Sequence, residues 1–437
     1  MLSPSTPRAP GPLASVAAKF GILRVDDQGR RTPWHVLRGN SGFRWYFIGS
    51  ATSDFGTWLQ NTAQVVLAYQ LAHSVLAVGL VTFAQFTSPL LLGPFAGVAT
   101  DRFGGRRTLL GTQVVSAVTA AILAGLDFGG LLHVRVLIIG AMVTGLAFTF
   151  ALPARNVTVQ RLVTRDKLKP AFAMDSVSYN LGRAAAPLCT ILMGVAGVSF
   201  AWAFTLNAAS FVTFGAILWG TRMRAAAEPE RRSRVWDGFL IAIRDHRILI
   251  LLLMVAAVTV ADDPILVLGP AIAKQLGVSS TLSSWFIAAL GAGTVLVSFR
   301  RSKHRPTVRL AAIALAALAL FMIMFTQAPT MWIAVLAALG AGGSCLIANS
   351  VTRAVLADRV GPDKSPAVMA VWAIAWAGSK PVASLLDGEL GSRIGPQWTG
   401  LILATPALVP IAVIVLLLAR DLLTQSFRGI RQVVVGL

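Results

Sequence analysis

A few charged side chains interrupt segments of the sequence that are otherwise apolar. They are Asp54, Asp175, Arg183, Asp262, Asp263 and Lys380. A charge at the centre of a membrane-spanning helix costs about 2.5–3.5 kcal/mol, so such residues usually face an internal cavity. A carboxyl group in a partly dry cavity can take up a proton on one side of a membrane and release it on the other. The chemistry that these residues could perform is therefore proton transfer and the binding of charged groups.

The acidic residues are candidates for carrying protons. Asp54 falls near the middle of its apolar segment, and Asp175 falls near the start of another. For Asp54, contact with a substrate and a structural hydrogen bond are the alternatives. Asp262 and Asp263 directly precede a proline, which breaks helices. This pair could admit protons or cations from outside, or could simply be solvated at the break.

The basic residues and some uncharged ones could bind a substrate. Arg183 could pair with Asp54 or Asp175, or bind an anion or the substrate. Lys380 could bind an anionic group or regulate a carboxylate, and its alternatives are an ion pair or snorkelling. Aromatic and amide side chains in the same segments suit a cavity for amphipathic molecules, although they could equally pack between helices. They are Trp58, Gln64, Asn180 and Trp376.

Long apolar segments must position these side chains. The chain has 437 residues, of which 55% are hydrophobic and only 13% are charged, and its mean hydropathy is +0.71. Helices are the expected form, because lipid offers no partners for free backbone groups. The sequence predicts an all-α membrane protein with twelve transmembrane helices. Their expected ranges are 45–70, 75–99, 108–127, 133–154, 171–194, 199–221, 247–270, 281–299, 308–327, 330–356, 366–389 and 398–419.

The net charge of +20 is distributed by loop. Basic residues concentrate in the N-terminal tail, in the loops after every second predicted helix and in the C-terminal tail. This alternation follows the rule that basic loops remain in the cytoplasm, so we expect both termini to be cytoplasmic. Nucleic-acid binding is then not needed to explain the charge. We expect a multi-pass protein of the plasma membrane, specifically of a bacterial inner membrane.

The predicted helices fall into two sets of six. We expect a largely disordered cytoplasmic extension at 1–44, a six-helix bundle at 45–221, a cytoplasmic linker with an interfacial helix at 222–246, a second bundle at 247–419 and a cytoplasmic tail at 420–437. The halves repeat a pattern in which Pro-Ala is followed by Met and later by Pro, at Pro170, Met174 and Pro187 and again at Pro366, Met369 and Pro381. Such six-helix pseudo-repeats are typical of transporters that rock around a central site.

The loop between the second and third helices carries the most specific motif, GVATDRFGGRR. It resembles the Gly-x-x-x-Asp-Arg/Lys-x-Gly-x-Arg/Lys-Arg/Lys signature of the major facilitator superfamily at every position. The matching residues are Gly97, Asp101, Arg102, Gly104, Arg106 and Arg107. The first two helices and the segment NLGRAAAP resemble the branch of siderophore exporters and macrolide efflux pumps, the transmembrane secretion effector type.

The resemblance implies the major facilitator fold, alternating access and a conformational latch in this loop. Asp101 would then contact the other half when the cytoplasmic side is closed, near a helix N-terminus. A purely topogenic basic loop is the alternative. Gly104 would permit a turn at positive φ.

Function follows as an expectation from these observations. We expect proton-coupled export of a small organic molecule, driven by the proton gradient with no cofactor and no metal. The phosphate-binding loop of ATP-driven pumps is absent, as are the common hydrolase motifs, so we do not expect an enzyme. The expected partners are the lipid bilayer and a small-molecule substrate, with no nucleic acid, and the expected state is a monomer. An importer, a lipid flippase and a non-transporting receptor or scaffold are the alternatives.

Overall fold

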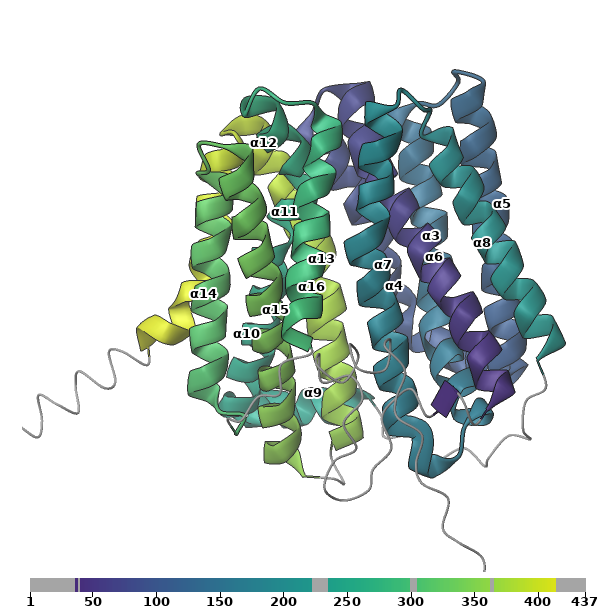
Figure 1. The fold of residues 1–437 in the computed structure, drawn as a ribbon. Helices are drawn as coiled ribbons and strands as arrows, with labels where there is room; N and C mark the ends of the chain where they lie inside the picture. Colours follow the sequence, from purple (N-terminus) through teal and green to yellow (C-terminus); the bar gives the residue numbers. More distant parts are fainter. Residues whose placement is uncertain (1–35, 38–39, 222–234, 299–304, 362–364, 414–437) are drawn as a thin grey trace, which may run out of the picture.

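The computed structural model of the chain describes residues 36–37, 40–221, 235–298, 305–361 and 365–413. Most of the predicted extension at 1–44, part of the linker at 222–246 and all of the tail at 420–437 lie outside these residues. Helices are the regular elements of the described part of the chain (Figure 1).

The first half is a run of six long helices. They are α3 (Ser41–Ala72), α4 (Val75–Phe103), α5 (Gly105–Phe128), α6 (Val134–Leu162), α7 (Leu168–Val195) and α8 (Ala201–Gly220). A short helix, α9 (Val235–Arg244), follows within the segment where an interfacial helix is predicted. One difference matters for the site: α6 continues to Leu162, past its predicted end at residue 154. Between Pro153 and Leu162 the sequence has no glycine or further proline, so the helix continues through Arg155.

The second half begins with a broken helix. It comprises α10 (His246–Asp262), α11 (Pro264–Val267) and α12 (Gly269–Gln275), followed by η2 (Ser280–Ser283), α13 (Ser284–Ser298), α14 (Val308–Thr326), α15 (Met331–Val360), α16 (Ser365–Arg393) and a final helix, Pro396–Val413. The break at Asp263 follows from Pro264, which lacks an N–H group and occupies the first position of α11.

Length and composition assign most of these helices to the membrane. Ten helices among the described residues are long and apolar enough to cross a bilayer. The other two long ones, α3 and α7, have 32 and 28 residues but carry more polar side chains. With α10 to α12 taken as one broken segment, these helices occupy the twelve predicted positions. The predicted all-helical membrane fold is confirmed.

Helices of the two halves pack closely at one end of the bundle. There α4 packs against α16 and α7 against α13. A Cβ atom added to Gly79 would lie 2.5 Å from the carbonyl oxygen of Ser384 and 2.8 Å from the Cα of Gly388, so the two backbones touch. At the same end, Gln70 donates to the hydroxyl of Thr281 at 3.3 Å. We call this the sealed end; it is the upper end in Figure 1, where α12 lies. The opposite end carries the basic turn between α4 and α5 and the short helix η1 (Arg165–Lys167), and is called the basic end.

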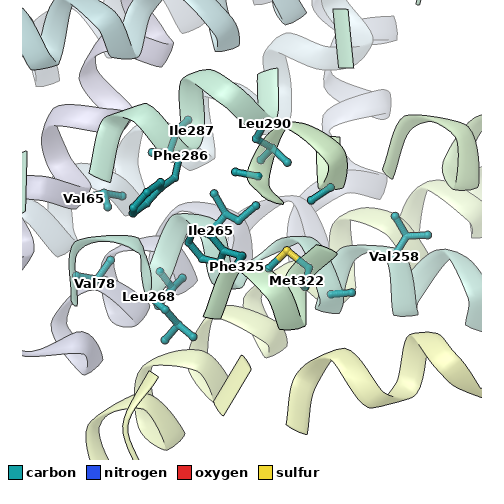
Figure 2. Close-up of a cluster of buried hydrophobic side chains, with 14 of the residues drawn as sticks. Val65, Val78, Val258, Ile265, Leu268, Phe286, Ile287, Leu290, Met322 and Phe325 are labelled. Carbon is teal, nitrogen blue, oxygen red and sulfur yellow. The ribbon is translucent and has the colours of Figure 1, made fainter. Parts of the chain in front are cut away.

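An apolar cluster reinforces the contact between the halves. Figure 2 shows Val65 and Val78 from the first half beside Ile265, Leu268 and Phe286 from the second. The rings of Phe286 and Phe325 meet edge to face, with centroids 5.0 Å apart. Because these side chains are buried, water is excluded from the seam that they fill.

Candidate functional site

The first cluster of buried charges lies inside the first half and joins three helices. The guanidinium of Arg155 on α6 donates two hydrogen bonds to the carboxylate of Asp54 on α3, from Nη1 to Oδ1 at 2.7 Å and from Nη2 to Oδ2 at 3.1 Å. The same Nη2 donates to Oδ1 of Asp175 on α7 at 3.0 Å. Paired hydrogen bonds of this kind are among the strongest in proteins. A single guanidinium group therefore binds two carboxylates from different helices.

Hydroxyl groups complete this cluster. Ser178 donates to Oδ2 of Asp54 at 2.9 Å, and Ser50 donates to Oδ1 of Asp175 at 3.3 Å. Ser50 and Asp54 are one turn apart on α3, so both face α6 and α7. Asp54 is 4% exposed. These contacts hold both oxygens of Asp54 with fixed partners.

The structure corrects the predicted partner of Arg183. Asp54 and Asp175 do lie together, but the cation between them is Arg155, which lies one residue beyond the predicted end of its helix. Arg183 instead reaches Asp262 on α10, with Nη2 3.3 Å from Oδ2. The extension of α6 explains the difference, because it carries Arg155 into the bundle at the level of Asp54. The signal that could have found it is the absence of any helix stop between Pro153 and Leu162.

The Arg183–Asp262 pair joins the two halves. Its guanidinium also lies over the ring of Trp58, 5.3 Å from the ring centroid, in cation–π geometry. Nε of Arg183 and Oδ1 of Asp262 have no hydrogen-bond partner in the described part of the chain. Each member of the pair thus keeps an unused polar atom near the cavity described below.

A third set of charges lies inside the second half. Nζ of Lys380 on α16 is 2.6 Å from Oδ1 of Asp263, and Ser384 donates to Oδ2 of the same carboxylate at 2.5 Å. The Lys380 ammonium also lies 5.2 Å from the ring centroid of Phe86 on α4. Of the two alternatives for Lys380, this geometry matches the ion pair and not snorkelling. Asp263 is fully buried, so the interpretation of a solvated helix break is wrong for this residue.

One further buried acid, Asp387 on α16, was missed by the sequence reasoning. It is fully buried, and neither carboxylate oxygen has a hydrogen-bond partner among the described residues. Its spacing of four and then three residues along Lys380, Ser384 and Asp387 puts the three side chains on one face of the helix. That spacing was the available signal.

Two adjoining cavities lie beside these charges. One, of about 870 Å³ including space open to solvent, lies between the halves and is lined by Trp58, Phe86, Tyr179, Arg183, Asp262, Trp376 and Lys380 among others. The other, of about 770 Å³ on the same measure, lies in the first half beside Asp54 and Arg155. Both are lined by Asn61, Gln85, Phe86 and Tyr179, so they share a wall.

The predicted cavity residues divide into two groups. Trp58 and Trp376 line the cavity between the halves. Gln64 is buried and bonded to Gln60 instead, which matches its alternative role in packing. The Asn180 amide donates to the Ser176 carbonyl one turn back and lines neither cavity. The prediction of Gln64 and Asn180 as cavity residues is therefore wrong: Gln64 lies one helical turn beyond the cavity-lining Gln60 and is buried against α6, and the Asn180 amide is bound to the backbone of its own helix.

The signature loop is a tight connection at the basic end. Helix α4 ends at Phe103, Gly104 has φ +84°, and α5 begins at Gly105, which confirms the predicted turn at positive φ. Arg106 donates to the carbonyl of Trp219 near the end of α8. This bond is favourable because the C-terminal end of a helix presents free carbonyl groups. Asp101, Arg102 and Arg107 are exposed.

A second contact at the basic end involves Asp245, just outside the membrane-spanning part of α10. Its carboxylate caps α10 by accepting the backbone N–H of Arg247 at 2.9 Å, and it accepts Nε of Arg359 from α15 at 3.1 Å. Desolvation opposes the charged form, but these hydrogen bonds prevail and hold the pKa of Asp245 below its ordinary value. The contact ties the start of α10 to the end of α15.

Two bundles of membrane helices around a charged central cavity define a secondary transporter of the major facilitator type. A family model described as transmembrane secretion effector matches residues 31–425, and the chain belongs to this family of the major facilitator superfamily. It is a transporter, not an enzyme. The family resemblance inferred from the signature loop is confirmed.

Known proteins agree with this assignment. The chain is 23% identical to the uncharacterized MFS-type transporter YfiS of Bacillus subtilis over 285 residues, which cover 62% of this chain and 66% of that protein. The fold is similar to that of the nucleoside transporter NupG, with a TM-score of 0.67 at 13% identity, covering 84% of this chain and 97% of that one. It is also similar to a bacterial homologue of the human lysosomal transporter Spinster in an inward-facing conformation, with a TM-score of 0.63 at 14% identity, covering 84% and 91%.

Proposed function

We propose that this chain exports a small organic molecule in exchange for protons, by alternating access of a cavity between its two halves. The observation that carries the proposal is the Asp54–Arg155–Asp175 cluster in the wall of that cavity system. It contains two carboxylates and one guanidinium. The cluster has one negative charge in excess when both acids are ionised, and a proton on either acid would remove it.

Proton uptake would change the geometry of this cluster. A protonated Asp54 or Asp175 no longer attracts the guanidinium as strongly, so Arg155 would shift toward the acid that stays ionised. The two acids lie on different helices, and this shift would alter the contact of α6 with α3 and α7. Asp54 remains the first candidate carrier, with Asp175, Asp262 and Asp263 as the others. Each of the four has a cationic partner that a proton would displace.

The two halves provide the moving parts of the proposal. Residues 45–221 and 247–419 would rock against each other, joined by the linker at 222–246. The distribution of basic residues supports a cytoplasmic basic end with both termini on that side, so the sealed end would face outward. The structure described above would then be the state closed to the outside. Opening it requires separation of Gly79 from Gly388 and of Arg183 from Asp262.

The signature loop would stabilise the alternate state. Asp101 would contact the second half when the basic end closes, and Gly97, Arg102 and Arg107 would shape the loop around it. Arg106 would hold the loop to α8, as its bond to Trp219 supports. The loop would thus bias the equilibrium between two global states.

The cavity lining supports an amphipathic substrate. Aromatic rings of Trp58, Phe86 and Trp376 suit a flat apolar body, while Arg183 and Asp262 offer charges of both signs. The family description, transmembrane secretion effector, supports export as the direction.

Solute-induced proton movement in proteoliposomes tests the proposal. The panel would contain hydrophobic cations, macrolides and siderophores, with the wild type compared with Asp54→Asn. Asp358→Asn is a matched control, because Asp358 is an exposed carboxylate on α15. We expect substrate-dependent proton flux in the wild type and the control and its loss in Asp54→Asn.

Flux that survives in Asp54→Asn would transfer the carrier role to Asp175 or to Asp262 and Asp263. The absence of flux with every compound would overturn proton-coupled export and favour an importer, a flippase or a receptor.

A further inference from the structure

Asp387 differs from the ion-paired acids inside the bundle, because no partner for it lies among the described residues. It is 0% exposed, and both of its carboxylate oxygens lack a hydrogen-bond donor in the described part of the chain. Asp54, Asp175, Asp262 and Asp263 each accept a bond from a basic side chain. An ionised carboxylate that is buried without a donor carries a large free-energy cost, whereas its neutral form carries a much smaller one.

The charges that face Asp387 do not compensate it. From its own helix, Lys380 is two turns away on the same face, but its ammonium is bound to Asp263. From the junction of α10 and α11, Asp263 adds a negative charge, and Asp262 is paired with Arg183 of α7. Among the described residues, α11 (Pro264–Val267) and the part of α4 that packs here, Leu76 and Gly79, bring no titratable group. Three acids thus share two cations.

We propose that Asp387 is a proton-binding site in the second half of the chain, and that Lys380 alternates between Asp263 and Asp387. In the structure described above, Asp387 is protonated and Lys380 binds Asp263. When the Asp387 O–H bond breaks, its proton goes to water and the carboxylate keeps the electron pair. Lys380 then has a second anion on the same helical face to bind. The Lys380–Asp263 ion pair then weakens, so α16 is attached less tightly to the junction of α10 and α11.

The position of Asp387 decides when it can exchange this proton. The next residue, Gly388, packs directly against the backbone of α4 at Leu76 and Gly79, within the sealed end. Water reaches Asp387 only when this seam between α4 and α16 opens. Proton exchange at Asp387 is therefore linked to opening of the sealed end. This link is independent of the cluster around Asp54, which lies in the other half.

Infrared difference spectroscopy of the purified full-length protein in lipid tests the proton site without any substrate. A protonated carboxylic acid has a C=O stretch that is separate from the carboxylate bands. We expect such a band at neutral pH in the wild type and the loss of one protonated carboxyl per chain in Asp387→Asn. Glu389→Gln is the control, because Glu389 lies on the same helix but pairs with the exposed Arg393, and it should keep the band.

A second variant keeps the test decisive if Asp387→Asn fails to fold. Asp387→Glu retains the acid, so the band should shift in frequency rather than vanish. A band that Asp387→Asn or Asp387→Glu leaves unchanged would overturn the proposal, as would a wild-type band that sodium ions abolish, because the site would then bind a metal cation.

The link to transport rests on the proposed function and is measured separately. In proteoliposomes, Asp387→Asn should retain exchange of substrate across the membrane but lose accumulation driven by a pH gradient. Accumulation equal to that of wild type would overturn a coupling role for Asp387 and leave the infrared result standing. A wild type without proton flux would remove the proposed function instead, again without affecting the infrared band.

Discussion

Arg183 of α7 and Asp262 of α10 form an ion pair of 3.3 Å that crosses from one half of the chain to the other. Only part of each side chain is accessible, 18% for Arg183 and 11% for Asp262. Removing one member of a buried pair costs about 3–5 kcal/mol, because the other charge is left without a partner. This pair therefore holds the halves in the arrangement in which the sealed end is closed.

Substitution of either member should destabilise this arrangement. We expect Arg183→Gln and Asp262→Asn each to lower the thermal unfolding temperature in lipid nanodiscs, and the double variant to recover part of the loss. The control is the exposed pair of Glu389 and Arg393, where Glu389→Gln should cost at most about 1 kcal/mol. Strictly additive losses in the double variant would show that the two side chains are not coupled.

Arg155 should be the most sensitive residue of the first half. Arg155→Lys keeps the charge but cannot make the paired bonds to Asp54 while also reaching Asp175. We expect transport to fall at least tenfold while the protein still inserts and folds, since about 1.4 kcal/mol of lost interaction corresponds to a factor of ten. Initial transport rates, normalised to the amount of purified protein, provide the measurement. Wild-type rates in Arg155→Lys would show that a point charge between the two acids suffices.

The glycine contact at the sealed end should control access from that side. A side chain at Gly79 would meet the backbone of Ser384 and Gly388, so Gly79→Leu should keep the sealed end open. A cysteine at Leu76, in a chain whose Cys189 and Cys345 are replaced by serine, should then react faster with a water-soluble maleimide. Gly111→Leu is the control, because nothing lies within 4 Å of that position. Equal labelling rates in both variants would contradict a closed seam.

Asp245 should make stability depend on pH at the basic end. Its hydrogen bonds lower the pKa in the folded state, so the stabilisation is present above the ordinary value of 3.8 and is lost as pH falls through the lowered pKa. Asp245→Asn keeps a capping side chain but removes the charge. We expect the wild type to unfold at a higher temperature than Asp245→Asn at neutral pH, and the difference to shrink on acidification. A difference that is constant with pH would assign the effect to capping alone.

The signature loop gives a prediction that separates a latch from a topology signal. Asp101→Asn should leave insertion and expression intact but lower transport, because the latch acts on the equilibrium between states. A purely topogenic loop would instead give normal transport at normal expression. Initial transport rates with immunoblot quantification of membrane fractions distinguish the two results.

The sequence was informative about the helices because hydropathy over about 20 residues reports on the bilayer directly. The sequence was less informative about which charged side chains pair with each other. Asp54 and Asp175 were found as acids within apolar segments, but Arg155 fell outside the predicted helix because the apolar run ends before the helix does. Arg183 was given the wrong partner, since side chains far apart in one sequence carry no sign of which helices face each other.

Asp387 illustrates the same limit in another way. It falls near the end of its predicted helix, where a charge is ordinarily solvated at the membrane surface. Neighbouring helices cover this part of α16: Gly388 packs against α4 at Gly79, and Ser384 is bonded to Asp263 at the start of α11. Depth along one helix can be read from a sequence, whereas cover by a neighbouring helix depends on the fold.

The break after α10 places two acids on adjacent residues with different attachments. Asp262 holds the first half through Arg183, and Asp263 holds α16 through Lys380. The Cα atoms of adjacent residues are about 3.8 Å apart, joined by one planar peptide unit. A rotation of that unit that draws Asp262 away from Arg183 must also reorient Asp263. The peptide between them therefore couples the two ion pairs, so that a separation of the halves also changes the contact between Asp263 and Lys380.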